Sequence, residues 1–369
     1  MAIDVNNPTE ESAKYGTVND FGSTINRLTS NGNPASQLTD ALYGVNASSK
    51  YKQMHINSDV DNIVFFTRPQ LNLTTDNIRG DAILSQLLTD NNSGLNIKTY
   101  IRLLLDPRLS KQDVVDGEVV SGLTSPLINE GLPFIPILSN TFKTITGWPD
   151  PVLPTYVATE GNKKEQWSMV DGSIDIFNIF DIDTKFVNIS EEPITLLMQV
   201  WTRYASLVFE GKITPYSDYL VNRTIDYQTR IYNIVRGHNP FIIKKMGCTG
   251  VSMVKNIPMG LFFDRDKDVN DIAQSKEIDF RFESSGADYN NLRRLLDFNL
   301  TIAAFNPRAA EIVFNRYPFD KDESKNGSMV KLDFNLLNIL DNKAIPIIDI
   351  ENSTLEWWID QQDIQFTTY

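Results

Sequence analysis

The sequence predicts an α+β fold in which mostly antiparallel strands surround one packed amphipathic helix, with irregular arms. Three observations predict this class. Runs of β-branched and aromatic residues occur before and after residues 193–210, where the apolar residues follow helical spacing. An Asp-Gly pair stands between two strand-like runs, which is typical of a tight hairpin. Residues 1–60 are rich in Asn, Ser, Thr and Gly, which predicts an extended arm.

Charge and composition exclude several classes of function. The chain has 369 residues and a net charge of -13, so a sequence-specific nucleic-acid-binding protein is not expected. The single cysteine and two histidines exclude a disulfide framework, a multi-cysteine zinc site and a three-histidine metal site. One cysteine also suits a reducing cytoplasm. We find no apolar run long enough for a membrane span, no secretion signal and no nucleotide-binding motif, so we predict no cofactor, no membrane and no catalysis.

Residues 61–150 are expected to form an α+β segment followed by an irregular crossover. Residues 62–68 are predicted to form a buried strand that ends at Pro69. Helical spacing is predicted over residues 81–88, whereas residues 98–105 suit a strand or a helix. Four prolines from residue 126 to residue 149 predict that residues 114–150 form an irregular crossover with short extended pieces.

Residues 151–300 are expected to form the β core. Asp171-Gly172 is predicted to turn residues 165–170 back onto residues 173–187, because a type I′ turn needs positive φ at both central positions. Both faces of the second run are partly apolar. We therefore expect this hairpin to be covered on both sides, or to be covered on one side by another subunit.

The helix at residues 193–210 is the clearest element. Pro193 suits the first helical position, and Gly211 suits the left-handed position after the last turn. Its apolar stripe predicts that Trp201 and Tyr204 pack in the core. Residues 301–369 are expected to form an α/β extension. Further strands are predicted at residues 224–235, 241–254 and 277–282, and further helices at 289–298 and 307–314.

An acidic loop at residues 264–271 partly follows a calcium-binding pattern. Asp264, Asp266 and Asp268 alternate as the first ligands would, but Val269 stands where the loop needs glycine, and Ser275 where it needs glutamate. We therefore predict a solvated loop and no metal site. Cys248 is expected to be a buried thiol rather than a nucleophile.

Several segments together resemble virion structural proteins of large contractile-tailed bacteriophages. The resemblance spans roughly residues 60–300. It rests on Val64-Phe-Phe-Thr-Arg-Pro-Gln-Leu-Asn-Leu73, Thr146-Gly-Trp-Pro-Asp150, Trp167-Ser-Met-Val-Asp-Gly172, Ile225-Asp-Tyr227 with Arg230-Ile-Tyr232, and Lys245-Met-Gly-Cys-Thr-Gly-Val-Ser-Met-Val-Lys-Asn-Ile-Pro-Met-Gly260.

The resemblance implies a non-enzymatic component of a tail tube, neck or baseplate, located in the virion and assembled in the host cytoplasm. It also implies a tail-tube-like fold, a small β-barrel or sandwich with one helix, whose partners are copies of itself in a ring and other tail, neck or baseplate proteins. The predicted interface residues are Trp167, Asp171 and Gly172 of the hairpin, together with Phe66 and Arg68 at the mouth of the barrel. A negative face lining a DNA conduit is a further hypothesis.

Two alternatives remain open at this point. Aromatic-rich β domains often bind sugars, so the chain could be a receptor- or carbohydrate-binding module of the tail, with Trp148, Trp357 and Trp358 as stacking platforms. A polysaccharide-cleaving enzyme would need two carboxyl groups roughly 5–9 Å apart in a cleft.

Overall fold

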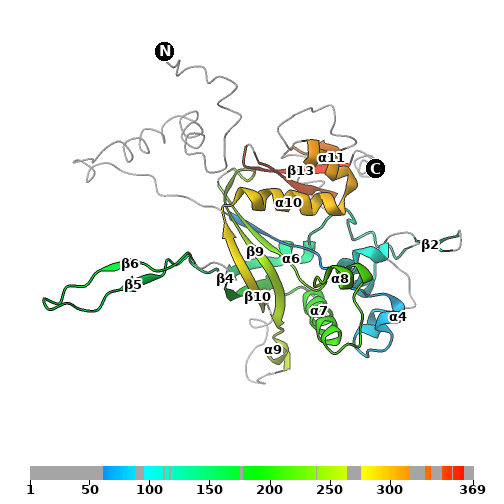
Figure 1. Ribbon diagram of the computed structural model, residues 1–369. Helices are drawn as coiled ribbons and strands as arrows, with labels where there is room; N and C mark the ends of the chain where they lie inside the picture. Colours follow the sequence, from blue (N-terminus) through cyan, green and yellow to red (C-terminus); the bar gives the residue numbers. More distant parts are fainter. Residues whose placement is uncertain are drawn as a thin grey trace, which may run out of the picture. The chain divides into compact units, whose positions relative to one another are not determined.

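The computed structural model describes residues 61–88, 95–110, 113–115, 118–120, 122–174, 178–237, 239–263, 276–315, 329–333, 343–350 and 352–360 (Figure 1). The predicted N-terminal arm and the acidic loop lie outside these residues. The described chain falls into two units. Unit 2 holds residues 64–233 and 247–289, and unit 1 holds residues 234–246, those up to 63 and those from 290 onward. The predicted boundary near residue 150 lies inside unit 2.

A six-stranded sheet is the largest element of the fold. Its central pairs β9–β10 and β10–β7, and its edge pair β7–β4, are antiparallel. Side chains of β7 and β10 alternate between buried and exposed, which is the pattern of a sheet with one covered face. The strand order is β1 (Asp61–Phe66), β8 (Ile231–Arg236), β9 (Ile243–Asn256), β10 (Glu277–Tyr289), β7 (Ile179–Val187) and β4 (Phe142–Thr146).

The sheet curls towards a barrel. Phe66 on edge strand β1 and Phe186 on β7 have ring centroids 5.8 Å apart, although four strand spacings in a flat sheet would separate them by roughly 19 Å. At the β1 edge, the Ile135 amide donates to the Phe66 carbonyl at 2.9 Å. The chain then passes through α6 (Pro136–Thr141) into β4 at the opposite edge. The predicted α+β class, with a barrel-like antiparallel sheet, is confirmed.

The amphipathic helix is confirmed as α7 (Pro193–Phe209), which begins at Pro193 as predicted. Gly211 follows it with φ of 70°, the left-handed conformation expected there. Trp201 and Tyr204 of its apolar stripe are buried. They belong to the same core cluster as the inward-facing phenylalanines of the sheet, which are Phe66, Phe186, Phe280 and Phe282.

The sequence left open whether residues 98–105 form a strand or a helix, and the structure shows a helix. They form α5 (Ile97–Leu105), in which the Asn96 side chain caps the first turn by accepting from the Lys98 amide at 3.0 Å. Helical spacing at residues 81–88 yields only a 3₁₀ turn, η2 (Leu84–Leu87). The remaining short elements of unit 2 are α4 (Thr75–Ile78), η3 (Pro107–Ser110), β2 (Asp113–Val115), β3 (Glu118–Val120), α8 (Ser217–Asn222) and α9 (Met259–Phe263).

The predicted crossover at residues 114–150 contains the expected short extended pieces, such as β4, but it also contains the helix α6, which was not expected. Pro136 stands at the start of α6, a position that tolerates proline because its missing N–H has no intrahelical partner. This proline therefore marks where a helix begins rather than an absence of structure.

The predicted Asp171-Gly172 hairpin turn is also wrong. Strand β6 (Ser168–Val170) pairs with the preceding β5 (Thr155–Val157), whereas β7 joins the large sheet. The Asp171 amide donates to the Pro154 carbonyl at 3.0 Å, so Asp171 extends the β5–β6 ladder. Neither Asp171 nor Gly172 has the positive φ of a type I′ turn, and Lys164, between the two strands, has φ of 60°.

Unit 1 contains two helices and a three-stranded sheet. The buried Asn299 of α10 donates to the Ile348 carbonyl at 2.7 Å and accepts from the Ile348 amide at 2.9 Å, which fixes the helix to β12. No helix among the described residues is long and apolar enough to cross a bilayer. The elements are α10 (Leu292–Phe305), α11 (Pro307–Asn315) and the strands β11 (Met329–Lys331), β13 (Thr354–Asp360) and β12 (Ile345–Asp349), in that sheet order.

Candidate assembly surface

The β5–β6 hairpin leaves its apolar side chains in solvent. All six residues in its two strands are exposed, and Figure 1 shows the hairpin as a separate two-stranded ribbon. Tyr156 is 49% exposed, Trp167 60% and Met169 52%. A lone two-stranded ribbon is marginally stable in water, and clustered exposed apolar residues mark interaction surfaces.

The register separates the hairpin into two faces. Tyr156 lies directly opposite Met169, and the Ala158 amide donates to the Trp167 carbonyl at 2.9 Å. Because residues alternate along each strand and opposed residues share a face, Tyr156, Ala158, Trp167 and Met169 lie together. We call these four residues the aromatic face. The opposite face carries Thr155, Val157, Ser168 and Val170.

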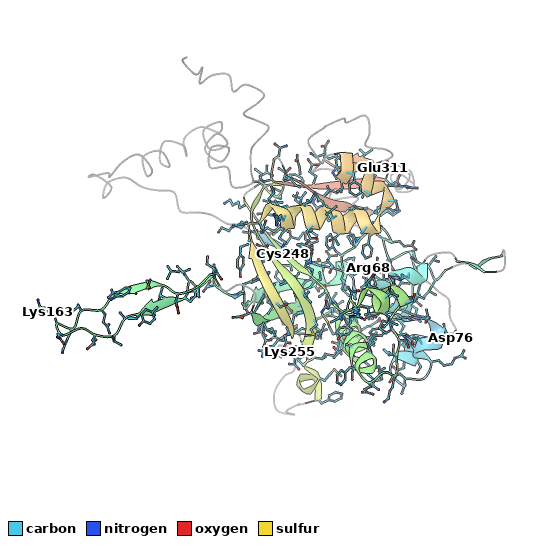
Figure 2. The ribbon with its side chains drawn as sticks, viewed as in Figure 1. Arg68, Asp76, Lys163, Cys248, Lys255 and Glu311 are labelled. Atoms are coloured by element: carbon cyan, nitrogen blue, oxygen red, sulfur yellow. The ribbon has the colours of Figure 1, made fainter. Side chains whose placement is uncertain are left out.

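The tip of the hairpin is a short closed loop. The Gly161 amide donates to the Glu165 carbonyl at 3.0 Å, and the Lys164 amide donates to the Gly161 carbonyl at 2.9 Å. The Glu165 carboxylate accepts from the Lys163 amide at 2.7 Å. The side chains of Lys163 and Lys164 are exposed, and Figure 2 marks Lys163 at the far end of the ribbon.

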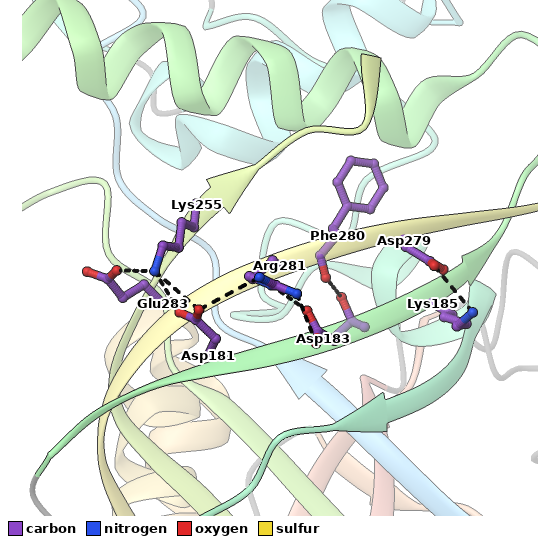
Figure 3. A network of polar contacts seen from close by, with 9 residues as sticks. Asp181, Asp183, Lys185, Lys255, Asp279, Phe280, Arg281 and Glu283 are labelled. Atoms are coloured by element: carbon purple, nitrogen blue, oxygen red, sulfur yellow. Dashed lines mark hydrogen bonds and ion pairs between the residues drawn. The ribbon is translucent and has the colours of Figure 1, made fainter. Parts of the chain in front are cut away.

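The exposed face of the large sheet is a second candidate surface, and it is charged (Figure 3). Arg281 donates to Asp183 at 2.6 Å. Lys255 bridges two strands, with Asp181 at 2.9 Å and Glu283 at 2.8 Å. We call this surface the charged face. Its five carboxylates and four cations, which sum to -1, are Asp181, Asp183, Glu277, Asp279, Glu283, Lys143, Lys185, Lys255 and Arg281.

Each cation of the charged face is paired with a carboxylate of another strand of the same sheet. Lys185 contacts Asp279 at 3.2 Å, and Lys143 contacts Glu277. The hydrogen bonds that Lys255 donates to Glu283 and Asp181 raise the pKa of Lys255. A depression of about 310 Å³ lies on this face, bordered by Thr144, Thr146 and the Asp183–Arg281 pair. The face is close to neutral, in contrast to the net charge of -13 for the whole chain.

The predicted interface residues fall into two groups. Trp167, Asp171 and Gly172 all lie on the exposed hairpin. Phe66 is buried in the core of unit 2, with the ring of Phe282 5.6 Å away. Arg68 is buried too, with 5% of its surface exposed, so neither residue offers a surface for docking. The interface role of all five residues stays a prediction.

Arg68 serves the interior of unit 2. Its guanidinium donates to the carbonyls of Leu103 at 2.8 Å and Leu104 at 3.0 Å, which are the last carbonyls of α5, and to that of Leu132 at 3.1 Å. A cation at a helix C-terminus satisfies carbonyls that have no intrahelical partner. Burial lowers the pKa of Arg68 to about 10, so the side chain remains charged at neutral pH.

The tryptophans considered as sugar platforms are packed against protein. Trp148 is half-buried, with Tyr289 6.0 Å and Phe180 6.5 Å from its ring. Trp358 is buried, and Trp357 packs against the small apolar cluster of unit 1. The sequence signal that distinguishes the exposed Trp167 is its place in a short run with apolar residues on both faces.

The carboxyl group with the most perturbed environment is Asp106, at the end of α5. It is fully buried and accepts hydrogen bonds from the Leu73 amide at 2.8 Å and the Tyr216 hydroxyl at 2.9 Å. Burial raises the pKa of Asp106 to about 6. Such shifts often mark catalytic groups, but this carboxyl has no exposed surface and its partners join three segments of the fold. No metal-binding cluster of His, Cys, Asp or Glu occurs among the described residues.

The family model described as "Putative phage tail tube protein" matches residues 4–368. The chain belongs to this family. The membership confirms the resemblance to virion structural proteins of tailed phages and gives the chain a structural role in a phage tail. It also covers the N-terminal segment and the last seventy residues, which the sequence resemblance did not reach.

Two solved structures are also similar to this family member. One is the sheath/tube terminator of PVC, an extracellular contractile injection system, with 9% identity over 40% of this chain and 84% of that chain, at a TM-score of 0.23. The other is the tube-terminating cap of the anti-feeding prophage, with 9% identity over 48% of this chain and 98% of that chain, at 0.26. Both TM-scores are low, so these structures carry no further argument. No curated protein matches the chain.

Proposed function

We propose that the chain is a building block of the phage tail tube that assembles with copies of itself into rings and performs no catalysis. The observation that carries this proposal is the tail-tube family match over residues 4–368. Its place is in the virion, after assembly in the host cytoplasm, in contact with other tail proteins.

Two features of the structure support assembly. The six-stranded sheet is closed towards a barrel, and the β5–β6 hairpin supplies apolar surface that the described residues of unit 2 leave uncovered. Ring subunits meet through heterologous contacts, in which one patch binds a different patch of the next copy. A hairpin that binds elsewhere on the neighbouring subunit suits such a contact, since no self-complementary patch is required.

Electron microscopy of the purified full-length chain tests the proposal. We expect closed rings or stacked tubes of uniform diameter, and a mass in light scattering that rises with protein concentration. A strictly monomeric chain at every concentration tested would contradict the proposal. Binding of the monomer to particular sugars on a glycan array would instead favour the receptor-binding alternative.

A further inference from the structure

We propose that the aromatic face of the β5–β6 hairpin docks onto a second copy of this chain. This inference rests on the proposed function and adds to it the surface through which one subunit binds another. The hairpin contributes Tyr156, Trp167 and Met169, three large side chains that are each about half exposed in the single subunit.

The aromatic face is better suited to docking than the opposite face. Tyr, Trp and Met are enriched at protein–protein interfaces, and tryptophan and tyrosine supply much of the binding energy where they are buried. The opposite face mixes Val157 and Val170 with the hydroxyl residues Thr155 and Ser168. Hydroxyl groups lose water on burial and need new hydrogen bonds, so that face gains less from a partner.

The family match points to a second copy as the partner. In the tail tube of the proposed function, one kind of subunit repeats many times, so each exposed surface recurs beside other copies of the same chain.

Burial against a neighbouring copy would also stabilise the hairpin itself. Its strands are three residues long, and side chains on both faces are exposed, so in one subunit it is held mainly by its own ladder. A neighbouring copy would supply the missing layer against the aromatic face. Docking would then stabilise the hairpin and the contact together.

Matched substitutions on the two faces test the proposal. Trp167→Ala removes the largest side chain of the aromatic face, and Val170→Thr changes the opposite face at nearly constant volume. We expect Trp167→Ala to raise the concentration for half-assembly at least about tenfold, as loss of an interface tryptophan does, and Val170→Thr to change it less than about threefold. Light scattering and electron microscopy supply the measurement, and melting curves verify that both variants fold.

A disulfide across the hairpin shows whether Trp167→Ala weakens assembly by removing a contact between subunits or by unfolding the hairpin. In an antiparallel ladder, hydrogen-bonded residue pairs alternate with non-hydrogen-bonded pairs. The pairs Pro154–Asp171 and Ala158–Trp167 are hydrogen-bonded, so Thr155 and Val170 form a non-hydrogen-bonded pair. Such pairs bring side chains closest, so Thr155→Cys with Val170→Cys can lock the register. The oxidised double variant should assemble at least as readily as its reduced form. Adding Trp167→Ala to the stapled chain should still weaken assembly about tenfold or more.

The outcomes distinguish the two proposals. If the wild-type chain stays monomeric, the proposed ring assembly is wrong. If the wild type forms rings and Trp167→Ala forms them at the same concentration, ring assembly stands and the docking proposal is wrong. The docking proposal also fails if stapling restores full assembly to Trp167→Ala, because the tryptophan would then act only by holding the hairpin together.

Discussion

The β5–β6 hairpin and the β7–β10 pair are both antiparallel strand pairs, but they differ in what covers them. Along β7 and β10, every second side chain enters the core, including Ile182, Phe280 and Phe282, and the opposite face is closed by cross-strand ion pairs. The hairpin has comparable apolar content and no covering layer. The comparison teaches that backbone pairing alone does not stabilise a strand pair, and that uncovered apolar side chains point to another molecule.

The lengths of the strands and their position relative to the core explain why β7–β10 is covered and β5–β6 is not. Strand β7 has nine residues and β10 has thirteen, whereas β5 and β6 have three each. The long strands share a core with the buried stripe of α7, whose apolar area offsets the entropy lost on folding. The comparison predicts large effects of substitution in the sheet and small effects in the hairpin when the single subunit is measured.

The largest effect is expected from Phe282→Ala in β10. Phe282 is fully buried and lies between the rings and aliphatic side chains of the core. Its truncation should lower the free energy of unfolding by about 3–5 kcal/mol, since it loses apolar contacts and leaves a cavity. Urea denaturation of the subunit gives the measurement.

Phe209→Ala is the matched control for that substitution. Phe209 ends α7 and is 92% exposed, so the same truncation should change stability by no more than about 0.5 kcal/mol. If both variants lost the same free energy of unfolding, burial would not explain the difference between covered and uncovered side chains.

An intermediate effect, dependent on pH, is expected at Asp106. The pKa of its buried carboxyl is raised from 3.8 to about 6, so the folded state holds this proton more tightly than the unfolded state. Its contribution to stability is therefore fully present below pH 4 and is lost as the pH rises through about 6. The shift corresponds to roughly 2–3 kcal/mol.

Asp106→Asn isolates this contribution because asparagine does not titrate. Asparagine keeps only one of the two oxygens that accept from the Leu73 and Arg108 amides, and this loss of one acceptor is a constant penalty. Because the wild type loses stability as the pH rises and the variant does not, the free energy of unfolding of Asp106→Asn relative to wild type should rise by roughly 2–3 kcal/mol between pH 4 and pH 7. A difference that is flat with pH, measured by chemical denaturation in matched buffers, would show that Asp106 does not titrate as its burial implies.

The smallest effect on the single subunit is expected from Trp167→Ala. Because Trp167 is exposed, its truncation should change the free energy of unfolding of the monomer by no more than about 0.5 kcal/mol. Thermal melts below the assembly concentration give the measurement. A loss above about 2 kcal/mol would mean that the hairpin packs on its own subunit and would remove the contrast with β7–β10.

Particular elements show how far sequence reasoning reached. The helix α7 was predictable because Pro193, Gly211 and a continuous apolar stripe all mark the same segment. Strands β1, β9 and β10 were predictable from local runs of apolar and β-branched residues. The hairpin was placed in the correct region but with the wrong turn, because Asp-Gly fits a tight turn locally while strand β6 found its partner upstream.

The candidate interface residues were also predictable only in part. A hairpin strand at residues 165–170 that carries Trp167 could be predicted from the sequence, but its partner strand β5 could not, because the two partly apolar faces were expected of residues 173–187, where β7 joins the large sheet. The burial of Arg68 could not, because its partners are carbonyls of Leu103, Leu104 and Leu132, far along the chain, and a backbone carbonyl has no signature in sequence. The pairing of the charged face likewise depends on register between β7, β9 and β10.

The amino-acid sequence by itself determined the class of fold, the central helix, the strands near it and the acidic, motif-poor character of a structural protein. These properties follow from local periodicity, composition and charge, which act over a few residues. Only the tertiary structure decided which strands pair, which aromatic and charged side chains are buried, and which apolar surface remains open. Those outcomes depend on contacts between distant segments, where the free energy of burial is gained.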